Sequence, residues 1–355
     1  MINFTVGPVQ EYEKILRVGS QPTPYFRNEM FSRIMLENEN MMKHLLYLQD
    51  DGRVVFLTAS GTGAMEAAII NSFSTKDKVL IVDGGTFGHR FVELCQIYNI
   101  EHDVLVLPQE EDLTLDKLFP FENRGYTGFI INMHETSIGK LYDMNIVADF
   151  CNRNNLFLVV DAISSFLADP IYMSKWSIDV LITGSQKALA LPPGISIVAL
   201  SERGVSRVES NTVNSLYFDL KRALKDGERG QTPFTPAVSI LLQMNERLKD
   251  IFETGIAKEN ERIANLASYF RSKIGELPLK ILTHKLSNAV TPLCPINGMS
   301  AYEIFEILEH DYGIWICPSG GNLKDKLFRV GHLGDLKKED YDILIYALQK
   351  ICSSM

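Results

Sequence analysis

Short apolar runs alternate with stretches in which apolar residues recur at helical spacing along the first 200 residues. The runs predict buried strands at 54–57, 78–82, 103–108, 128–133, 156–161 and 194–200, with another ending just before Ser185. The helical spacing predicts helices at 27–48, 65–73, 90–99 and 144–154. This alternation is typical of an α/β fold with a mostly parallel sheet, whose ligands bind beyond the carboxyl ends of the strands.

The rest of the chain follows a different order, and residues 1–24 are irregular. We expect a loop-like stretch over 201–235 and two long helices over 237–255 and 256–277. Strands at 280–283, 290–295, 314–317 and 327–331 then mix with helices at 300–311 and 336–352. The pattern predicts an N-terminal arm (1–20), a large domain (21–245) and a smaller α+β domain (246–355).

Composition narrows the classes of function. The 355 residues carry a formal net charge of −9 and no basic block, which argues against nucleic-acid binding. Five scattered cysteines without a CxxC pair favour reduced thiols in the cytoplasm over zinc or disulfides. The start lacks the pattern of a signal peptide, and no apolar run approaches the roughly 20 residues that span a bilayer.

Two neighbouring strands deliver a carboxylate and an amine to the same expected edge of the sheet. The run LFLVVD ends on Asp161, and the next run ends on Ser185-Gln186-Lys187. This pair suits pyridoxal phosphate, because a lysine forms a Schiff base with the cofactor aldehyde. An aspartate keeps the pyridine nitrogen protonated, so that the ring accepts electrons.

A turn of small residues, Ala59 to Ala64, lies between the first strand and its helix. Backbone N–H groups and the helix dipole favour a phosphate beside Ser60, Gly61 and Thr62. A plain strand–helix joint capped by a hydroxyl is equally consistent with this turn. It is neither a Walker loop nor a full GxGxxG motif, since Glu66 holds the third glycine position.

Two further turns fall at the same edge. Phe87 lies between glycines and would stack on a flat ring, although a hydrophobic plug under a loop is the commoner role. Thr136 and Ser137 follow another strand and either donate to a cofactor oxygen or cap the turn. His134 precedes them and is either a base or a structural histidine.

The order of these turns resembles the class V aminotransferases, of the fold type I pyridoxal phosphate enzymes, over essentially the whole chain. The most specific motif is SQKAL (185–189) with PPG (192–194), which is similar to the signature of alanine/serine–glyoxylate aminotransferases. FRVG (328–331) resembles the carboxylate-binding segment of that group and of 2-aminoethylphosphonate–pyruvate aminotransferases. The resemblance implies a fold type I large domain with a seven-stranded sheet and a smaller C-terminal domain.

The same resemblance implies roles for individual residues. Lys187 would hold the cofactor as a Schiff base and move the substrate proton, and Asp161 would pair with the ring nitrogen. The other cofactor-binding residues would be Ser60, Gly61, Thr62, Phe87, Thr136, Ile163, Ser185 and Gln186, among which Thr136 would reach the region of the cofactor's 3′ oxygen. Arg329 would bind the substrate carboxylate, with Gly7 on the substrate side. Thr232 and Thr235 would reach the phosphate of a partner subunit, which implies a homodimer with shared sites.

The implied activity is transfer of an amino group from alanine, serine or 2-aminoethylphosphonate to pyruvate or glyoxylate. The chain departs from the family where Ile138 replaces a third hydroxyl residue and where Gly7-Pro8 is shortened. A lyase such as a cysteine desulfurase is the alternative, with Cys317 as its thiol. A cofactor-free binding protein would be expected to lose Lys187, and a dinucleotide dehydrogenase lacks the required glycine turn, with Asp83 its nearest acidic residue.

Overall fold

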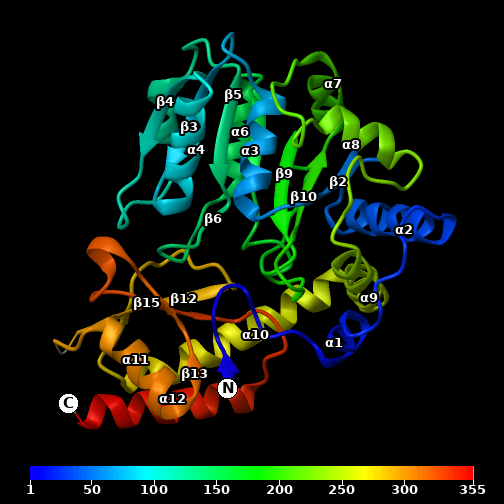
Figure 1. Cartoon of the computed structure of the whole chain (residues 1–355). Coiled ribbons are helices and arrows are strands. Elements are labelled where there is room, and N and C mark those ends of the chain that lie inside the picture. Colours follow the sequence, from blue (N-terminus) through cyan, green and yellow to red (C-terminus); the bar gives the residue numbers. More distant parts are fainter. Residues whose placement is uncertain (297, 355) are drawn as a thin grey trace.

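The structure, a computed structural model, describes residues 1–296 and 298–354 (Figure 1). Its largest sheet has seven strands in the order β2-β10-β9-β8-β5-β3-β4, and β10 alone among them runs antiparallel to its two neighbours. The mostly parallel sheet predicted from the sequence is therefore confirmed. The strands are β2 (Arg53–Thr58), β3 (Lys78–Asp83), β4 (Glu101–Val106), β5 (Gly128–Asn132), β8 (Phe157–Asp161), β9 (Val180–Gly184) and β10 (Ile195–Leu200).

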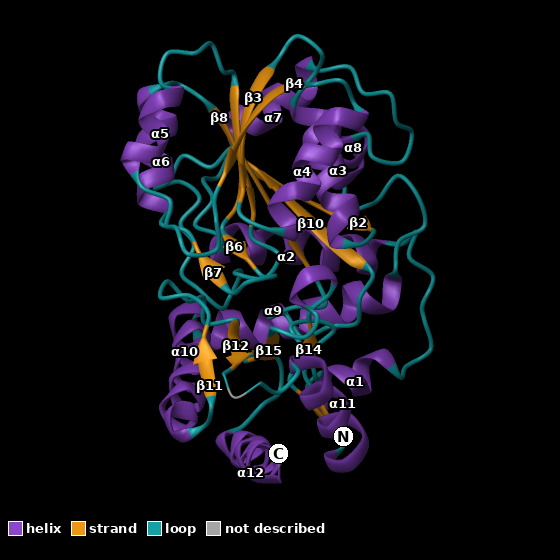
Figure 2. Cartoon of the chain, turned by 90° about the vertical axis from the view of Figure 1, so that its left-hand side faces the viewer, coloured by secondary structure: helices purple, strands orange, loops and turns teal. Residues whose placement is uncertain are grey.

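Helices cover both faces of this sheet (Figures 1 and 2). Alternate residues of each strand enter different cores, so that Leu158 and Val160 pack on one side and Val159 on the other. Strands that are buried on both faces need continuous apolar runs, which explains why the sequence marks them clearly. The covering helices include α2 (Glu29–Leu45) and α6 (Met144–Arg153) on one face, and α3 (Gly61–Ser72) and α4 (Thr86–Ile97) on the other.

Three sequence-based expectations were wrong in detail. The stretch 201–235 contains α7 (Glu202–Ser210) and α8 (Leu220–Gly227), and residues 1–24 contain β1 (Ile2–Asn3) and α1 (Glu13–Gly19). Residues 314–317 form two strands, β13 (Ile314–Trp315) and β14 (Cys317–Pro318), in different sheets. α7 escaped notice because it buries only Gly204 and Val208, too few positions to show a period.

The C-terminal part has a core of its own. A four-stranded antiparallel sheet has the order β11-β12-β15-β14, and apolar side chains such as Phe270, Phe328 and Tyr341 pack around it. Phe4 joins this core, and β1 pairs with β13. The elements are β11 (Leu279–Ile281), β12 (Val290–Pro295), β15 (Phe328–Gly331), α10 (Ile256–Lys273), α11 (Ala301–Tyr312) and α12 (Lys338–Ser354).

The predicted boundary at 245/246 falls inside α9 (Val238–Thr254), which packs against α1 and α2. The next helix, α10, packs against α12. We therefore propose that the smaller domain begins at Gly255, between the two helices, where φ is +90°. No helix within the described ranges is long and apolar enough to span a membrane.

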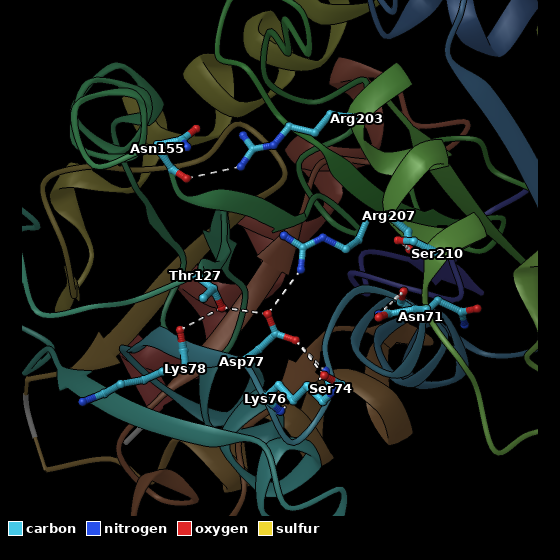
Figure 3. A network of polar contacts seen from close by, with 11 residues as sticks. Asn71, Ser74, Lys76, Asp77, Lys78, Thr127, Asn155, Arg203, Arg207 and Ser210 are labelled. Carbon is cyan, nitrogen blue, oxygen red and sulfur yellow. Dashed lines mark hydrogen bonds and ion pairs between the residues drawn. The ribbon is translucent and has the colours of Figure 1, made fainter.

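Polar contacts close the amino-terminal edge of the large sheet (Figure 3). Asp77 accepts hydrogen bonds from the backbone and hydroxyl of Ser74, at 2.9 and 3.0 Å, and from Thr127 Oγ1 at 2.9 Å. Arg207 of α7 adds an ion pair of 3.2 Å to the same carboxylate. Asp77 thus joins the loops before β3 and β5 to a helix, at the edge opposite the carboxyl ends of the parallel strands.

Candidate active site

Most of the candidate residues meet at the carboxyl edge of the large sheet. Asp161 is the last residue of β8 and lies beside Asn132, the last residue of β5. Lys187 follows the end of β9 by three residues, and Ser60 caps the start of α3 after β2. Because these strands run parallel, their ends place the side chains along the same edge of the sheet.

Asp161 is almost fully buried, with 6% of its surface exposed. Among the described residues, its carboxylate accepts a single hydrogen bond, which Ile163 N donates to Oδ1 at 2.7 Å. Burial raises the pKa of Asp161 to about 7, and the nearby charge of Glu135 adds to this, while Lys187 and Arg90 act against it. A buried carboxylate with so little support fits a cationic partner, such as a protonated ring nitrogen.

The environment of Lys187 disfavours the protonated form of its amine. Burial lowers the pKa of Lys187, as does the charge of Arg329, and Cys317 and Asp161 oppose this shift. None of the described residues forms a hydrogen bond with its Nζ. Gly7 lies against the stem of the lysine, since a Cβ there would come within 2.7 Å of Lys187 Cδ. The φ of +139° at Gly7 also favours glycine.

The turn at the start of α3 is built to receive an anion. Ser60 caps the helix by accepting a hydrogen bond from Gly63 N at 3.4 Å. Gly61 packs on Ile163, whose Cδ1 would lie 2.7 Å from an added Cβ. Thr62 Oγ1 accepts a hydrogen bond from Arg90 Nη1 at 3.1 Å, which leaves the hydroxyl proton of Thr62 free for another acceptor.

Arg90 and Glu135 are site residues that the sequence analysis missed. The guanidinium of Arg90 lies 5.2 Å from the centre of the Phe87 ring. The buried carboxylate of Glu135 accepts hydrogen bonds from Gly88 N at 2.9 Å and Phe87 N at 3.4 Å, and so caps α4 from a neighbouring turn. The sequence did hold one indication of Arg90, since this arginine follows the aromatic residue of the turn, Phe87, by three positions.

Both the side-chain hydroxyl and the backbone carbonyl of Thr136 form hydrogen bonds. Its hydroxyl lies 2.6 Å from Ser164 Oγ, which lies 2.8 Å from His134 Nδ1. Its carbonyl accepts a hydrogen bond from Arg329 Nη1 at 3.1 Å. His134 is buried, and burial together with nearby cations lowers the pKa of its ring to about 3. The ring is therefore uncharged at neutral pH and carries one proton.

Arg329, on β15, brings the smaller sheet to the site. Its Nη2 donates to Pro318 O at 2.7 Å, and its buried Nε has no partner among the described residues. Cys317 is paired opposite Arg329 in the sheet, and its Sγ accepts a hydrogen bond from Val6 N at 3.1 Å. The guanidinium keeps N–H groups available for a carboxylate.

Three candidates lie apart from this cluster, and a fourth borders it. Ser185 is completely buried, and its hydroxyl donates to Pro192 O at 2.7 Å and accepts from Ile195 N at 3.2 Å. The Ser185 hydroxyl is thus used within its own loop, and its contact with a cofactor stays a prediction. Thr232 and the exposed Thr235 lie beside the end of β2, and Gln186 remains partly exposed.

The residues present fit pyridoxal phosphate. They supply a turn at a helix N-terminus for the phosphate, an unpaired amine, a buried carboxylate for a cation and an aromatic ring, each beside the end of a different strand or helix. Within residues 1–296 and 298–354, no group of three or more His, Cys, Asp or Glu side chains is arranged to hold a metal ion.

Comparisons with known proteins agree with this assembly. Residues 11–322 match the family described as Aminotransferase class-V. A "soluble hydrogenase, small subunit" from Synechococcus is 29% identical, covering 98% of this chain and 92% of that one. An L-aspartate–glyoxylate aminotransferase from Paracoccus denitrificans is 27% identical, covering 94% and 86%. The solved structure of a subgroup IV aspartate aminotransferase from Thermus thermophilus superposes with a TM-score of 0.93, 25% identity and coverage of 100% and 99%.

Proposed function

The chain belongs to the class V aminotransferase family, and from this premise we propose that it moves an amino group between small substrates. The donor would be alanine, serine or 2-aminoethylphosphonate, and the acceptor pyruvate or glyoxylate. One observation carries the proposal: Lys187 lies close enough to the buried carboxylate of Asp161 for each charge to shift the pKa of the other, and no described residue forms a hydrogen bond with the Lys187 amine. The family implies pyridoxal phosphate as the cofactor.

Lys187 would hold the cofactor covalently through Nζ, and after its release would carry the proton from the substrate Cα. Its lowered pKa favours the neutral amine that both tasks need. Asp161 would keep the ring nitrogen protonated, and Ser60, Gly61 and Thr62 would bind the phosphate. When bound, the cofactor supplies a ring that stabilises negative charge at the substrate carbon.

Substrate size follows from the carboxylate site. Arg329 is the guanidinium whose charge acts on Lys187, and we propose that it binds the single carboxylate of the substrate. The aspartate–glyoxylate activity of the Paracoccus relative supports glyoxylate as the acceptor. It also makes aspartate a necessary competitor in any screen of donors.

The cofactor proposal is tested by absorption. Purified protein given pyridoxal phosphate should show the visible band of a lysine-bound cofactor, and borohydride should fix the cofactor to Lys187. The Lys187→Ala variant should lose both. A protein that stays colourless and forms no reducible lysine adduct would refute the proposal.

A matrix of donors against acceptors, followed by half-reaction spectra, would identify the substrates. Transfer from alanine or serine to glyoxylate at a higher kcat/KM than from aspartate supports the proposed class, and the opposite order overturns it. Cys317→Ala should retain transamination. Loss of amino transfer in that variant, with release of sulfide from cysteine by the wild type, would favour the lyase.

We further propose that the enzyme is a cytoplasmic homodimer with shared sites. Two observations support the dimer. Among the described residues, neither the Thr232 hydroxyl, which donates to Phe234 O, nor the Thr235 hydroxyl forms a hydrogen bond with a residue of the cluster, and exposed aromatic side chains, Tyr217 and Phe234, stack next to them. Such rings are typical of surfaces that bind another chain. Sedimentation of the purified protein as a monomer would contradict this assembly.

A further inference from the structure

Three buried side chains at the site form a hydrogen-bonded chain that the proposed function leaves unexplained. Thr136 Oγ1 lies 2.6 Å from Ser164 Oγ, and Ser164 Oγ lies 2.8 Å from His134 Nδ1. Their exposed fractions are 6%, 4% and 3%. At the far end of the chain, His134 Nε2 is buried without a partner among the described residues.

The two ends of this chain are linked, because each hydroxyl has one proton to give. If His134 is protonated at Nδ1, it donates to Ser164, which donates to Thr136, and the proton of Thr136 remains available to a ligand. If His134 is protonated at Nε2, every bond reverses. Thr136 then spends its proton on Ser164 and can only accept from a ligand.

The surroundings favour the first direction. A proton on Nε2 would be a buried donor with no acceptor, which proteins rarely tolerate, whereas a bare lone pair costs less. Burial lowers the pKa of His134 to about 3, and the positive charges of Arg329 and Arg271 add to this shift. The ring is therefore neutral and carries its one proton on a single nitrogen.

We propose that His134, in the tautomer protonated at Nδ1, is a positioning residue that makes Thr136 a hydrogen-bond donor toward the 3′ oxygen of the cofactor. This inference rests on the proposed function, since it assumes that pyridoxal phosphate binds. A donated hydrogen bond weakens the hold of the negative 3′ oxygen on the proton at the lysine nitrogen. The donor thus lowers the pH at which the bound cofactor changes colour.

The pH titration of the visible band tests this role. Thr136→Val should raise the spectral pKa by about one unit, the size expected from one hydrogen bond to a charged oxygen. Ser164→Ala and His134→Leu keep the Thr136 hydroxyl but remove the partner that fixes its direction, so each should raise the spectral pKa by a smaller amount. Combining Ser164→Ala with His134→Leu should add nothing, because both break the same chain. His134→Asn, which keeps an amide donor near the Nδ1 position, should recover part of the shift.

Ser165→Ala is the matched control. Ser165 is the next residue along and is completely buried, and its hydroxyl has no partner in the described part of the chain. Its loss should leave the spectral pKa unchanged. Equal shifts in the Ser164 and Ser165 variants, or no shift in any variant of the chain, would overturn the inference.

The tautomer itself can be observed without the cofactor. In the nitrogen NMR spectrum of protein labelled at histidine, the His134 signals are those that His134→Leu removes. They should show a protonated Nδ1 and a bare Nε2, and protonation at Nε2 would overturn the inference. A wild type that shows no visible band refutes the proposed cofactor, whereas a wild type with a normal band and unshifted variants refutes only the role of His134.

Discussion

Arg90 shows how one side chain can serve two turns that lie far apart in the sequence. It donates to Thr62 in the phosphate turn and lies over the ring of Phe87 in the aromatic turn. Its position near the start of α4 also brings a positive charge close enough to act on Asp161. We therefore place Arg90 among the residues that orient the phosphate site.

Arg90→Met should weaken the binding of pyridoxal phosphate by at least about tenfold, because it removes a charge and frees the Thr62 hydroxyl to rotate. Binding of pyridoxal, which lacks the phosphate, should change little. Titration of both compounds into cofactor-free protein measures the two affinities. Arg124→Met is the control, since Arg124 is exposed and is not one of the residues of the candidate site. Equal losses for both compounds would show that Arg90 does not act through the phosphate.

The buried carboxylate of Asp161 should leave a pH signature in cofactor-free protein. Its pKa of about 7 exceeds the ordinary 3.8, so between these values the folded protein keeps a proton that the unfolded chain releases. Its contribution to stability is therefore largest at low pH and is lost as pH rises toward 7, by at most about 4 kcal/mol.

Chemical denaturation of wild type and Asp161→Asn at several pH values isolates this effect, because the difference cancels the other titrating groups. The stability of the wild type relative to the variant should fall between pH 4 and pH 7. Added pyridoxal phosphate should remove much of that fall, since a cationic ring nitrogen stabilises the ionised carboxylate. A flat difference would contradict the environment described for Asp161.

At the scale of elements, the sequence predicted the strands that are buried on both faces and missed the helices that are mostly exposed to solvent. The strands β3, β5, β8 and β9 appear as continuous apolar runs because both of their faces are covered. The helix α7 buries one apolar side chain, so its period is invisible, although Ser201 and Asp219 cap α7 and α8 as the sequence permits.

The site divides in the same way. Asp161 and Lys187 stand at the ends of apolar runs, so their meeting follows from a parallel sheet. Arg90 and Glu135 act through contacts between turns 28 and 47 residues apart, which no local pattern encodes. Ser185 was assigned to the cofactor by resemblance, and only the structure shows that its hydroxyl is used within its own loop.

The amino-terminal edge of the sheet offers a test of stability separate from catalysis. Asp77→Ala removes the acceptor of four contacts from Ser74, Thr127 and Arg207 and leaves their donors poorly paired (Figure 3). It should lower the free energy of unfolding by about 3 kcal/mol, while the visible band per folded molecule stays unchanged. Asp51→Ala, at an exposed position, should have little effect in the same urea titration.

At the scale of the whole molecule, the site draws on both cores. Arg329 from the smaller sheet donates to the carbonyl of Thr136, in the turn that follows β5 of the larger sheet, and the arm residues Val6 and Gly7 contact Cys317 and Lys187. A proposed partner subunit would add Thr232 and Thr235 from outside. The candidate site thus combines segments drawn from nearly the full length of the chain.

Shared sites predict that two inactive variants restore each other. Lys187→Ala and the double variant Thr232→Ala, Thr235→Ala should each transaminate poorly. If the two are unfolded and refolded together, half of the dimers are mixed and each mixed dimer has one intact site. About a quarter of the wild-type activity should return. Recovery no greater than the sum of the separate variants would show that the threonines do not cross between subunits.

The docking of the first residues onto β13 and β15 also orders events during synthesis. Ile2 pairs with Ile314, and Phe4 O accepts a hydrogen bond from Gly331 N. Residues 2–4 leave the ribosome long before the surface that they bind, which emerges more than 300 residues later. Until then Gly7 cannot lie against Lys187, so a nascent chain carries this lysine without the glycine that packs on its stem. A partner fused ahead of Ile2 would be expected to delay this docking more than one fused behind the other end of the chain.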